Sequence, residues 1–131
     1  MRFILPIMLL MVGIIHILPL SGVLSAARLF ELYGMTFDDP NLEILMRHRA
    51  VLFGLLGIFL ICSAFMPSLQ LPALIAGFLS VVSFLYLSYS VGGYNEQVNR
   101  IVIADKVALV CLVVALVSYL VKIFNTEQVT V

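Results

Sequence analysis

Four long apolar stretches constrain this chain more than any other feature. They cover residues 3–20, 45–65, 69–90 and 101–124. Each is close to the ~20 residues that an α-helix needs to cross the hydrocarbon core of a bilayer. Within lipid every backbone N–H and C=O group must be bonded inside the protein, so each stretch is expected to be helical. The sequence therefore predicts an all-α fold, a four-helix transmembrane bundle.

Composition supports a membrane protein and argues against other classes. Of the 131 residues, 63% are hydrophobic and 11% are charged, whereas soluble domains carry about 25% charged residues. Seven basic and seven acidic residues give a formal net charge of zero, which is not the footprint of a nucleic-acid-binding protein. We expect membrane lipids as partners and no nucleic acid. A lipid-like small molecule, a second copy of the chain or a membrane partner protein are further possible partners.

Start and stop signals set the expected elements within a single transmembrane domain, 1–131. Asp39 and Pro40 are a typical N-cap and first helical residue, and Gly34 can close a short helix before them. The first stretch also has the basic start of a signal peptide, but it is longer than a usual h-region. The expected helices are about 3–20, 40–65, 69–91 and 98–124, with an interfacial helix at about 24–33.

Polar residues concentrate at one end of the predicted bundle. Four helices with short connections alternate in direction, so the end of the first and third helices meets the start of the second and fourth. Ionisable residues at membrane depth are costly and are functional candidates by default. We expect a ligand-binding site at this end, formed by these residues: His16, Glu43, Arg47, Tyr86, Asn95, Arg100 and Asp105.

Angular position along the second helix separates its basic residues. A stripe of small residues is formed by Ala50, Gly54, Gly57 and Ala64. Such residues let membrane helices approach closely. Arg47 and Glu43 fall on the same stripe as an i,i+4 pair, so Arg47 is predicted to face the interior, within reach of Glu43 and Asp105. His48 and Arg49 point elsewhere and are predicted to face lipid headgroups, as anchors, or another helix.

Several chemical roles are open for these residues. Asp105 can form a structural ion pair with Arg47, or serve a ligand or catalytic site. Acid–base chemistry by Asp105, Glu43 or His16 is the enzymatic alternative. His16 is interpreted as a hydrogen-bonded interior residue, which is the commoner role of a lone histidine at such a position. A bis-histidine haem site with His48 is disfavoured, because it would need His48 to face inward. No Cys/His cluster has metal-ligand spacing, so neither a metal nor a cofactor is expected.

Several segments resemble a known family. They are "GIIHILPLSG", "DPNLEILMRHRAVLFGLLG", "SVVSFLYL", "VGGYN" and "ADKVALVCLVV". With them nearly the whole chain resembles small four-helix proteins of Gram-negative bacterial inner membranes, similar in layout to DoxX-like membrane proteins. Members of that family often carry the name phosphopantetheine adenylyltransferase, but this sequence has no His-x-Gly-His nucleotidyltransferase motif. The resemblance implies a multi-pass protein of the bacterial inner membrane and brings no activity or catalytic residue.

The expected function follows from the polar end. We expect a membrane protein that binds a small amphipathic or lipid-like ligand there. The alternatives are a membrane enzyme acting on a lipid, quinone or isoprenoid, and an accessory subunit of a membrane complex. Five of the seven basic residues lie at this end: Arg28, Arg47, Arg49, Arg100 and Lys106. The positive-inside rule then predicts that the polar end faces the cytoplasm.

Overall fold

The computed structural model describes residues 2–130, and this part of the chain is helical and without β-strands. The predicted all-α class is therefore confirmed. In chain order the elements are α1 (Ile4–Ile17), the 3₁₀ helix η1 (Leu18–Val23), α2 (Ala26–Tyr33), α3 (Pro40–Phe65), the 3₁₀ turn η2 (Pro67–Leu69), α4 (Gln70–Val91) and α5 (Glu96–Val129).

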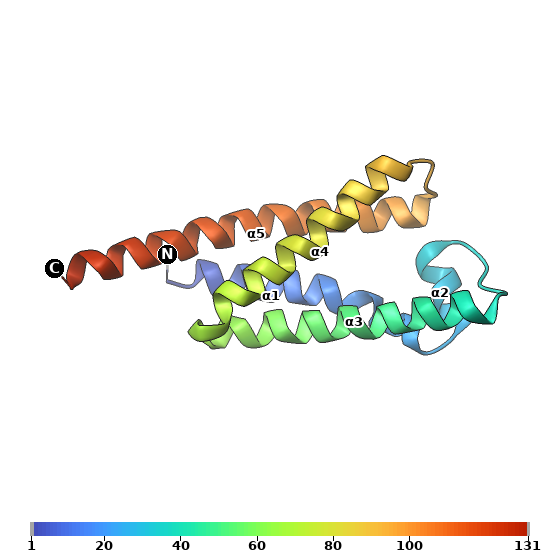
Figure 1. Ribbon diagram of the computed structural model, residues 1–131, viewed down its shortest axis with the longest axis horizontal. Helices are drawn as coiled ribbons and strands as arrows, with labels where there is room; N and C mark the ends of the chain where they lie inside the picture. The colour runs from blue at the N-terminus through green and yellow to red at the C-terminus, as the bar shows by residue number, and fades with distance from the viewer. Residues whose placement is uncertain (1, 131) are drawn as a thin grey trace.

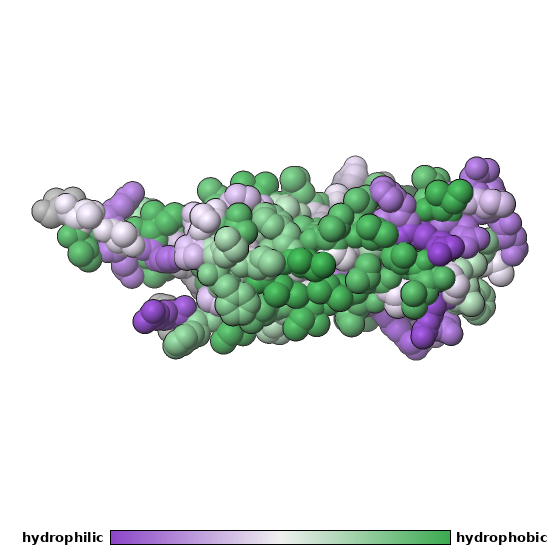
Figure 2. Space-filling model, turned by 90° about the horizontal axis from the view of Figure 1, so that it is seen from below, coloured by the Kyte–Doolittle hydropathy of each residue, from purple (hydrophilic) through white to green (hydrophobic). Residues whose placement is uncertain are grey.

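Four of these segments are long and apolar enough to cross a membrane: Ile4–Val23, Pro40–Phe65, Pro67–Val91 and Glu96–Val129. Helix α1 packs against α3 and α5, and α4 crosses obliquely from the end of α3 to the start of α5 (Figure 1). On the face that Figure 2 shows, apolar side chains cover the middle of the molecule, while hydrophilic ones gather at its two ends. This distribution is that of a multi-pass membrane protein.

The helix ends follow local chemistry and differ from the sequence prediction at two places. The first α-helix stops at Ile17 and continues as η1, because Pro19 has no N–H to donate to the preceding turn. Helix α5 runs to Val129, five residues beyond the expected end. The helix continues because the polar residues after Phe124 include neither Gly nor Pro. Within this extension Thr126 Oγ1 donates a hydrogen bond to the Lys122 carbonyl at 2.8 Å.

Helices α1 and α3 meet at two glycines. A Cβ atom placed on Gly57 would lie 2.8 Å from the Gly13 carbonyl oxygen, and one on Gly13 would lie 2.9 Å from that of Gly57. Real Cβ atoms essentially never approach so closely, so only glycine allows this backbone contact. The predicted small-residue stripe is buried in this interface, as Ala50, Gly54 and Ala64 are also buried. It brings the start of α3 alongside the end of α1.

Candidate functional site

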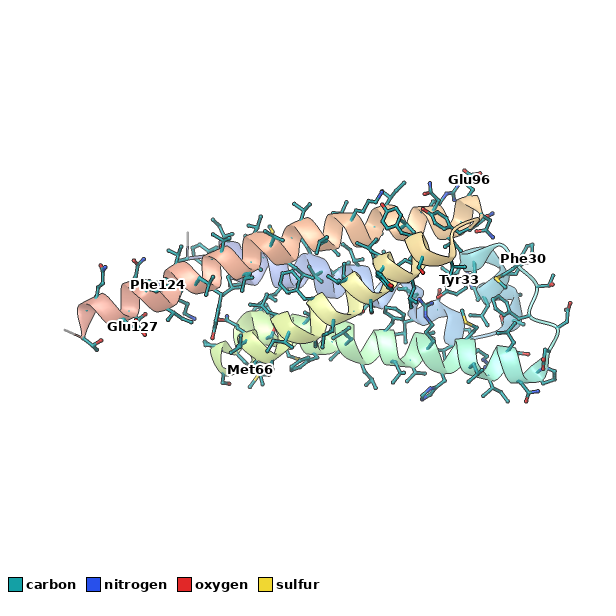
Figure 3. All side chains as sticks on the ribbon, turned by 45° about the horizontal axis from the view of Figure 1, so that its top comes forward. Phe30, Tyr33, Met66, Glu96, Phe124 and Glu127 are labelled. Carbon is teal, nitrogen blue, oxygen red and sulfur yellow. The ribbon has the colours of Figure 1, made fainter. Side chains whose placement is uncertain are left out.

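A cavity of about 280 Å³ lies at the polar end of the bundle and is lined by all five α-helices and η1. Its polar and charged lining residues are His16, Glu31, Tyr33, Arg49, Gln97, Arg100 and Asp105, and its aromatic walls include Phe53 and Phe84. Figure 3 places Tyr33 at the same end as Glu96, far from Met66 and Phe124 at the other end. The cavity therefore combines apolar walls with a few charged groups, as ligand sites commonly do.

Arg49 is the central basic residue of this cavity. Its Nη1 atom donates a 2.6 Å hydrogen bond to the hydroxyl of Tyr33, which is buried. The guanidinium carbon lies 4.6 Å from the centre of the Phe53 ring and 5.8 Å from that of Phe84. Cation–π contact of this kind stabilises a guanidinium that is partly removed from water. Of the two predicted directions for Arg49, the structure shows the one toward other helices, α2 and α4.

Arg49 lies on a face of α3 that is different from the small-residue stripe. The small-residue stripe identifies only the face of α3 that meets α1. At the polar end α2 and α4 also contribute to the cavity, so a second face of α3 turns inward. Arg49 and Phe53 are four residues apart on this second face, but the i,i+4 spacing alone does not show that the face turns inward.

Asp105 presents a carboxylate to the same cavity from α5. Its exposed fraction is 7%, and within residues 2–130 it forms neither a hydrogen bond nor a salt bridge. No fully buried side-chain oxygen or nitrogen in that range lacks a partner, so the carboxylate oxygens must adjoin the open space of the cavity. Arg49 is a charged neighbour of Asp105, although the two are not in direct contact.

His16 lies in the wall of the cavity with its ring nitrogens occupied. The imidazole is 2% exposed, and its Nδ1 lies 2.8 Å from the Val12 carbonyl oxygen. Because a carbonyl only accepts, Nδ1 carries the proton and Nε2 accepts from the Ser80 hydroxyl at 3.2 Å. This agrees with the interpretation of His16 as a hydrogen-bonded interior residue. His48 is exposed on α3 and does not share the cavity with His16.

Arg47 and Glu43 form the predicted i,i+4 ion pair, with 3.2 Å between Nη1 and Oε1. The prediction that Arg47 also lies within reach of Asp105 is wrong. Its Nε atom instead donates to the Val23 carbonyl at 2.8 Å, and Nη2 lies 3.4 Å from the Leu24 carbonyl. The carbonyls at a helix end lack intrahelical partners, so Arg47 fastens the end of η1 to α3. Neither Arg47 nor Glu43 is among the described residues that line the cavity.

The other three candidates divide between the cavity mouth, a helix cap and the outer surface. Arg100 lines the cavity but is largely exposed and pairs with Glu96 at 3.4 Å. Asn95 caps α5 through Val98 N–H at 2.9 Å, and its Nδ2 donates to the Tyr33 carbonyl at 2.6 Å. Tyr86 is 70% exposed on α4 and does not line the cavity in the described structure.

The arrangement can recognise a group that both donates and accepts hydrogen bonds. Arg49 offers a fixed cation to the cavity, and Asp105 offers carboxylate oxygens that have no partner in the described chain. Of the three acid–base candidates, His16 is held by two hydrogen bonds and Glu43 lies outside the cavity. Asp105 alone of these three combines cavity access with an unbonded ionisable group. No protein-family model, curated protein or solved structure matches this chain.

Proposed function

We propose that this is a bacterial inner-membrane protein that binds a small amphipathic or lipid-like molecule, with the polar group of that molecule in the cavity between Arg49 and Asp105. Kinship with the DoxX-like proteins is part of the same proposal. The observation that carries it is the Asp105 carboxylate, which is 7% exposed and forms neither a salt bridge nor a hydrogen bond among residues 2–130. Burial without a partner is costly, and a ligand that donates to Asp105 would offset that cost.

A purely structural role for the pair fits the geometry less well. A structural ion pair would bring Arg49 and Asp105 into contact, because two buried charges stabilise a fold only when they are directly paired. Arg49 is instead oriented by Tyr33 and Phe53, on the side of α2 and α3. The two charges line one cavity without forming a salt bridge, and this arrangement favours a third group that contacts both.

Cavity size limits what part of the ligand is enclosed. A volume of about 280 Å³ is at the lower end of small-molecule sites. It suits a headgroup, a hydroxylated ring or an isoprenoid end, and it does not suit a whole lipid. The apolar remainder would lie along the outer belt of the bundle, where side chains such as Leu18 are exposed. An amphipathic ligand meets both requirements.

Mass spectrometry of co-purified lipids tests this proposal. The wild-type protein and the Arg49→Ala and Asp105→Asn variants are purified in one mild detergent, with His48→Ala as the control at an exposed position. We expect a molecule enriched with the wild type and with the control, and depleted in both cavity variants. Equal lipid profiles in all four proteins would refute a ligand site here.

A catalytic role for Asp105 is the second candidate, favoured by the free carboxylate alone. It predicts that wild-type protein added to the retained molecule converts it to a product of different mass or retention time. The Asp105→Asn variant added to the same molecule would leave it unconverted. If the wild type also leaves the molecule unchanged, the binding function stands without catalysis.

A further inference from the structure

A second cavity lies at the opposite end of the bundle. It has a volume of about 810 Å³, opens to the surface, and is lined by the start of α1, the α3–α4 connection and the C-terminal half of α5. Figure 1 shows α5 continuing past the start of α1 and past the turn between α3 and α4. This projection supplies one wall of the cavity, and the predicted end at residue 124 would have left that wall incomplete. None of the residues predicted for the polar-end site lies here.

The charged residues of this second cavity are all basic. They are Arg2 and Lys122, and no Asp or Glu is found among the described lining residues. Lys122 is positioned by Gln70, whose Oε1 accepts a hydrogen bond from Lys122 Nζ at 3.2 Å. Gln70 is itself 3% exposed, so a buried amide orients the ammonium group. An ammonium has three donors, and two therefore remain for a ligand.

The remaining walls of the cavity are mostly apolar. They include Phe3, Leu5 and Pro6 from the start of the chain and Val121 and Val129 from α5. The volume is about three times that of the polar-end cavity and falls within the usual range for small-molecule sites. An apolar cavity with basic groups and no carboxylate is complementary to an acyl chain that ends in an anion.

We propose that this cavity binds an anionic phospholipid, with its phosphate between Arg2 and Lys122 and part of an acyl chain along the apolar walls. The site is separate from the polar-end cavity and does not depend on the function proposed for it. The ligand belongs to the membrane leaflet at the end of the molecule where both the start of α1 and the end of α5 lie. Its role is to fasten the projecting part of α5 to the rest of the bundle.

Native mass spectrometry of the detergent-solubilised protein tests the assignment. Phosphatidylglycerol and phosphatidylcholine with identical acyl chains are added in turn, and the populations of the one-lipid adducts are compared. A basic residue near an anionic lipid contributes about a fivefold preference. We expect phosphatidylglycerol to be preferred by at least this factor, and the preference to fall toward unity in the double variant Arg2→Gln, Lys122→Gln.

Two further variants make the result specific. Lys122→Arg keeps the charge and should retain the preference, while Lys106→Gln removes an exposed basic residue at the other end and should leave it unchanged. Equal binding of the two lipids by the wild type would overturn the proposal. A preference that survives in the double variant but is lost in Lys106→Gln would also overturn it, because the anionic lipid would then lie at the polar end.

A water-soluble headgroup separates a lipid site from a simple phosphate site. Excess glycerol phosphate should not displace phosphatidylglycerol, because the apolar walls of the cavity hold the acyl chain. Displacement by glycerol phosphate at concentrations similar to those of the lipid would refute the acyl-chain part of the assignment. Circular dichroism spectra of all variants provide the check on folding, and Arg2 and Lys122 are both exposed enough to be replaced without disturbing the core.

Discussion

Arg49 and Tyr33 are joined by a 2.6 Å hydrogen bond between a guanidinium nitrogen and the phenol oxygen. The bond connects α3 with the short helix α2, which lies at the polar end of the bundle (Figure 1). Tyr33 also packs edge-on against Phe37, with 6.3 Å between ring centres. One side chain thus provides the cation of the cavity and holds the interfacial helix against the membrane-spanning helices.

Replacing Arg49 should affect both stability and ligand retention. Hydrogen bonds to charged groups contribute about 1.5–3 kcal/mol in soluble proteins, whereas polar contacts in membranes average ~0.6 kcal/mol. We therefore expect Arg49→Ala to destabilise the protein by about 1–2 kcal/mol and to abolish retention of the co-purified molecule. Thermal unfolding followed by circular dichroism in detergent measures the first effect. His48→Ala should unfold like the wild type, and matching curves for all three proteins would contradict the role given to Arg49.

Replacing Asp105 should separate stability from function. Asp105→Asn removes a nearly buried charge that has no partner within the described chain. Leaving such a group unsatisfied costs about 1–3 kcal/mol, so after removal of the bound molecule from both proteins the variant should unfold at a higher temperature than the wild type, and it should not bind the ligand again. Asp38→Asn, at an exposed position, should change neither. A lower unfolding temperature for Asp105→Asn would indicate that the carboxylate is already paired.

The contact between Gly13 and Gly57 predicts opposite outcomes for two glycine-to-alanine changes. Alanine is favoured over glycine within a helix by about 1 kcal/mol, while overpacking costs about 1–3 kcal/mol. At Gly57 the new methyl group would meet backbone 2.8 Å away, so Gly57→Ala should be destabilising. At Gly77 it would meet the flexible end of Leu112 at 3.0 Å, and Gly77→Ala should be neutral or stabilising. Unfolding temperatures in the reverse order would refute this account of the α1–α3 interface.

Orientation in the membrane follows from the distribution of basic residues. With Cys62 and Cys111 replaced by Ala, single cysteines at the exposed positions Thr36 and Glu127 report on the two ends. The positive-inside rule predicts that a membrane-impermeant maleimide labels Glu127→Cys in intact spheroplasts, and Thr36→Cys only after lysis. Labelling of both in lysed cells is the control. Labelling of Thr36→Cys alone from outside would reverse the orientation.

The sequence was sufficient to predict the membrane-spanning helices and to identify the end of the bundle where the polar groups meet. Length and hydropathy define membrane helices because lipid leaves the backbone no alternative, and Asp39 marks the start of α3 as predicted, accepting from Asn41 N–H at 2.9 Å. Alternating helix direction predicted Asp105 and His16 at the same end of the bundle, and both line one cavity there.

The choice between Arg47 and Arg49 could not be made from the sequence. It depends on where α2 and α4 lie around α3, and helical spacing within α3 carries no information about its neighbours. The path of η1 is equally non-local, and its terminal carbonyls are what draw Arg47 away from Asp105. Side chains next to an irregular segment are therefore the least predictable part of this site.

The hydrogen bond from Asn95 to the Tyr33 carbonyl joins residues 62 positions apart in the chain. During synthesis from the N-terminus, α2 reaches the membrane surface while Asn95 has yet to be translated. The C-terminal end of α2 has no such partner until α3 and α4 have been inserted. The wall that α2 contributes is thus fixed only after Asn95 and α5 have been synthesised. A nascent chain arrested before α5 would contain the first three membrane-spanning segments but would lack the α5 side of the cavity.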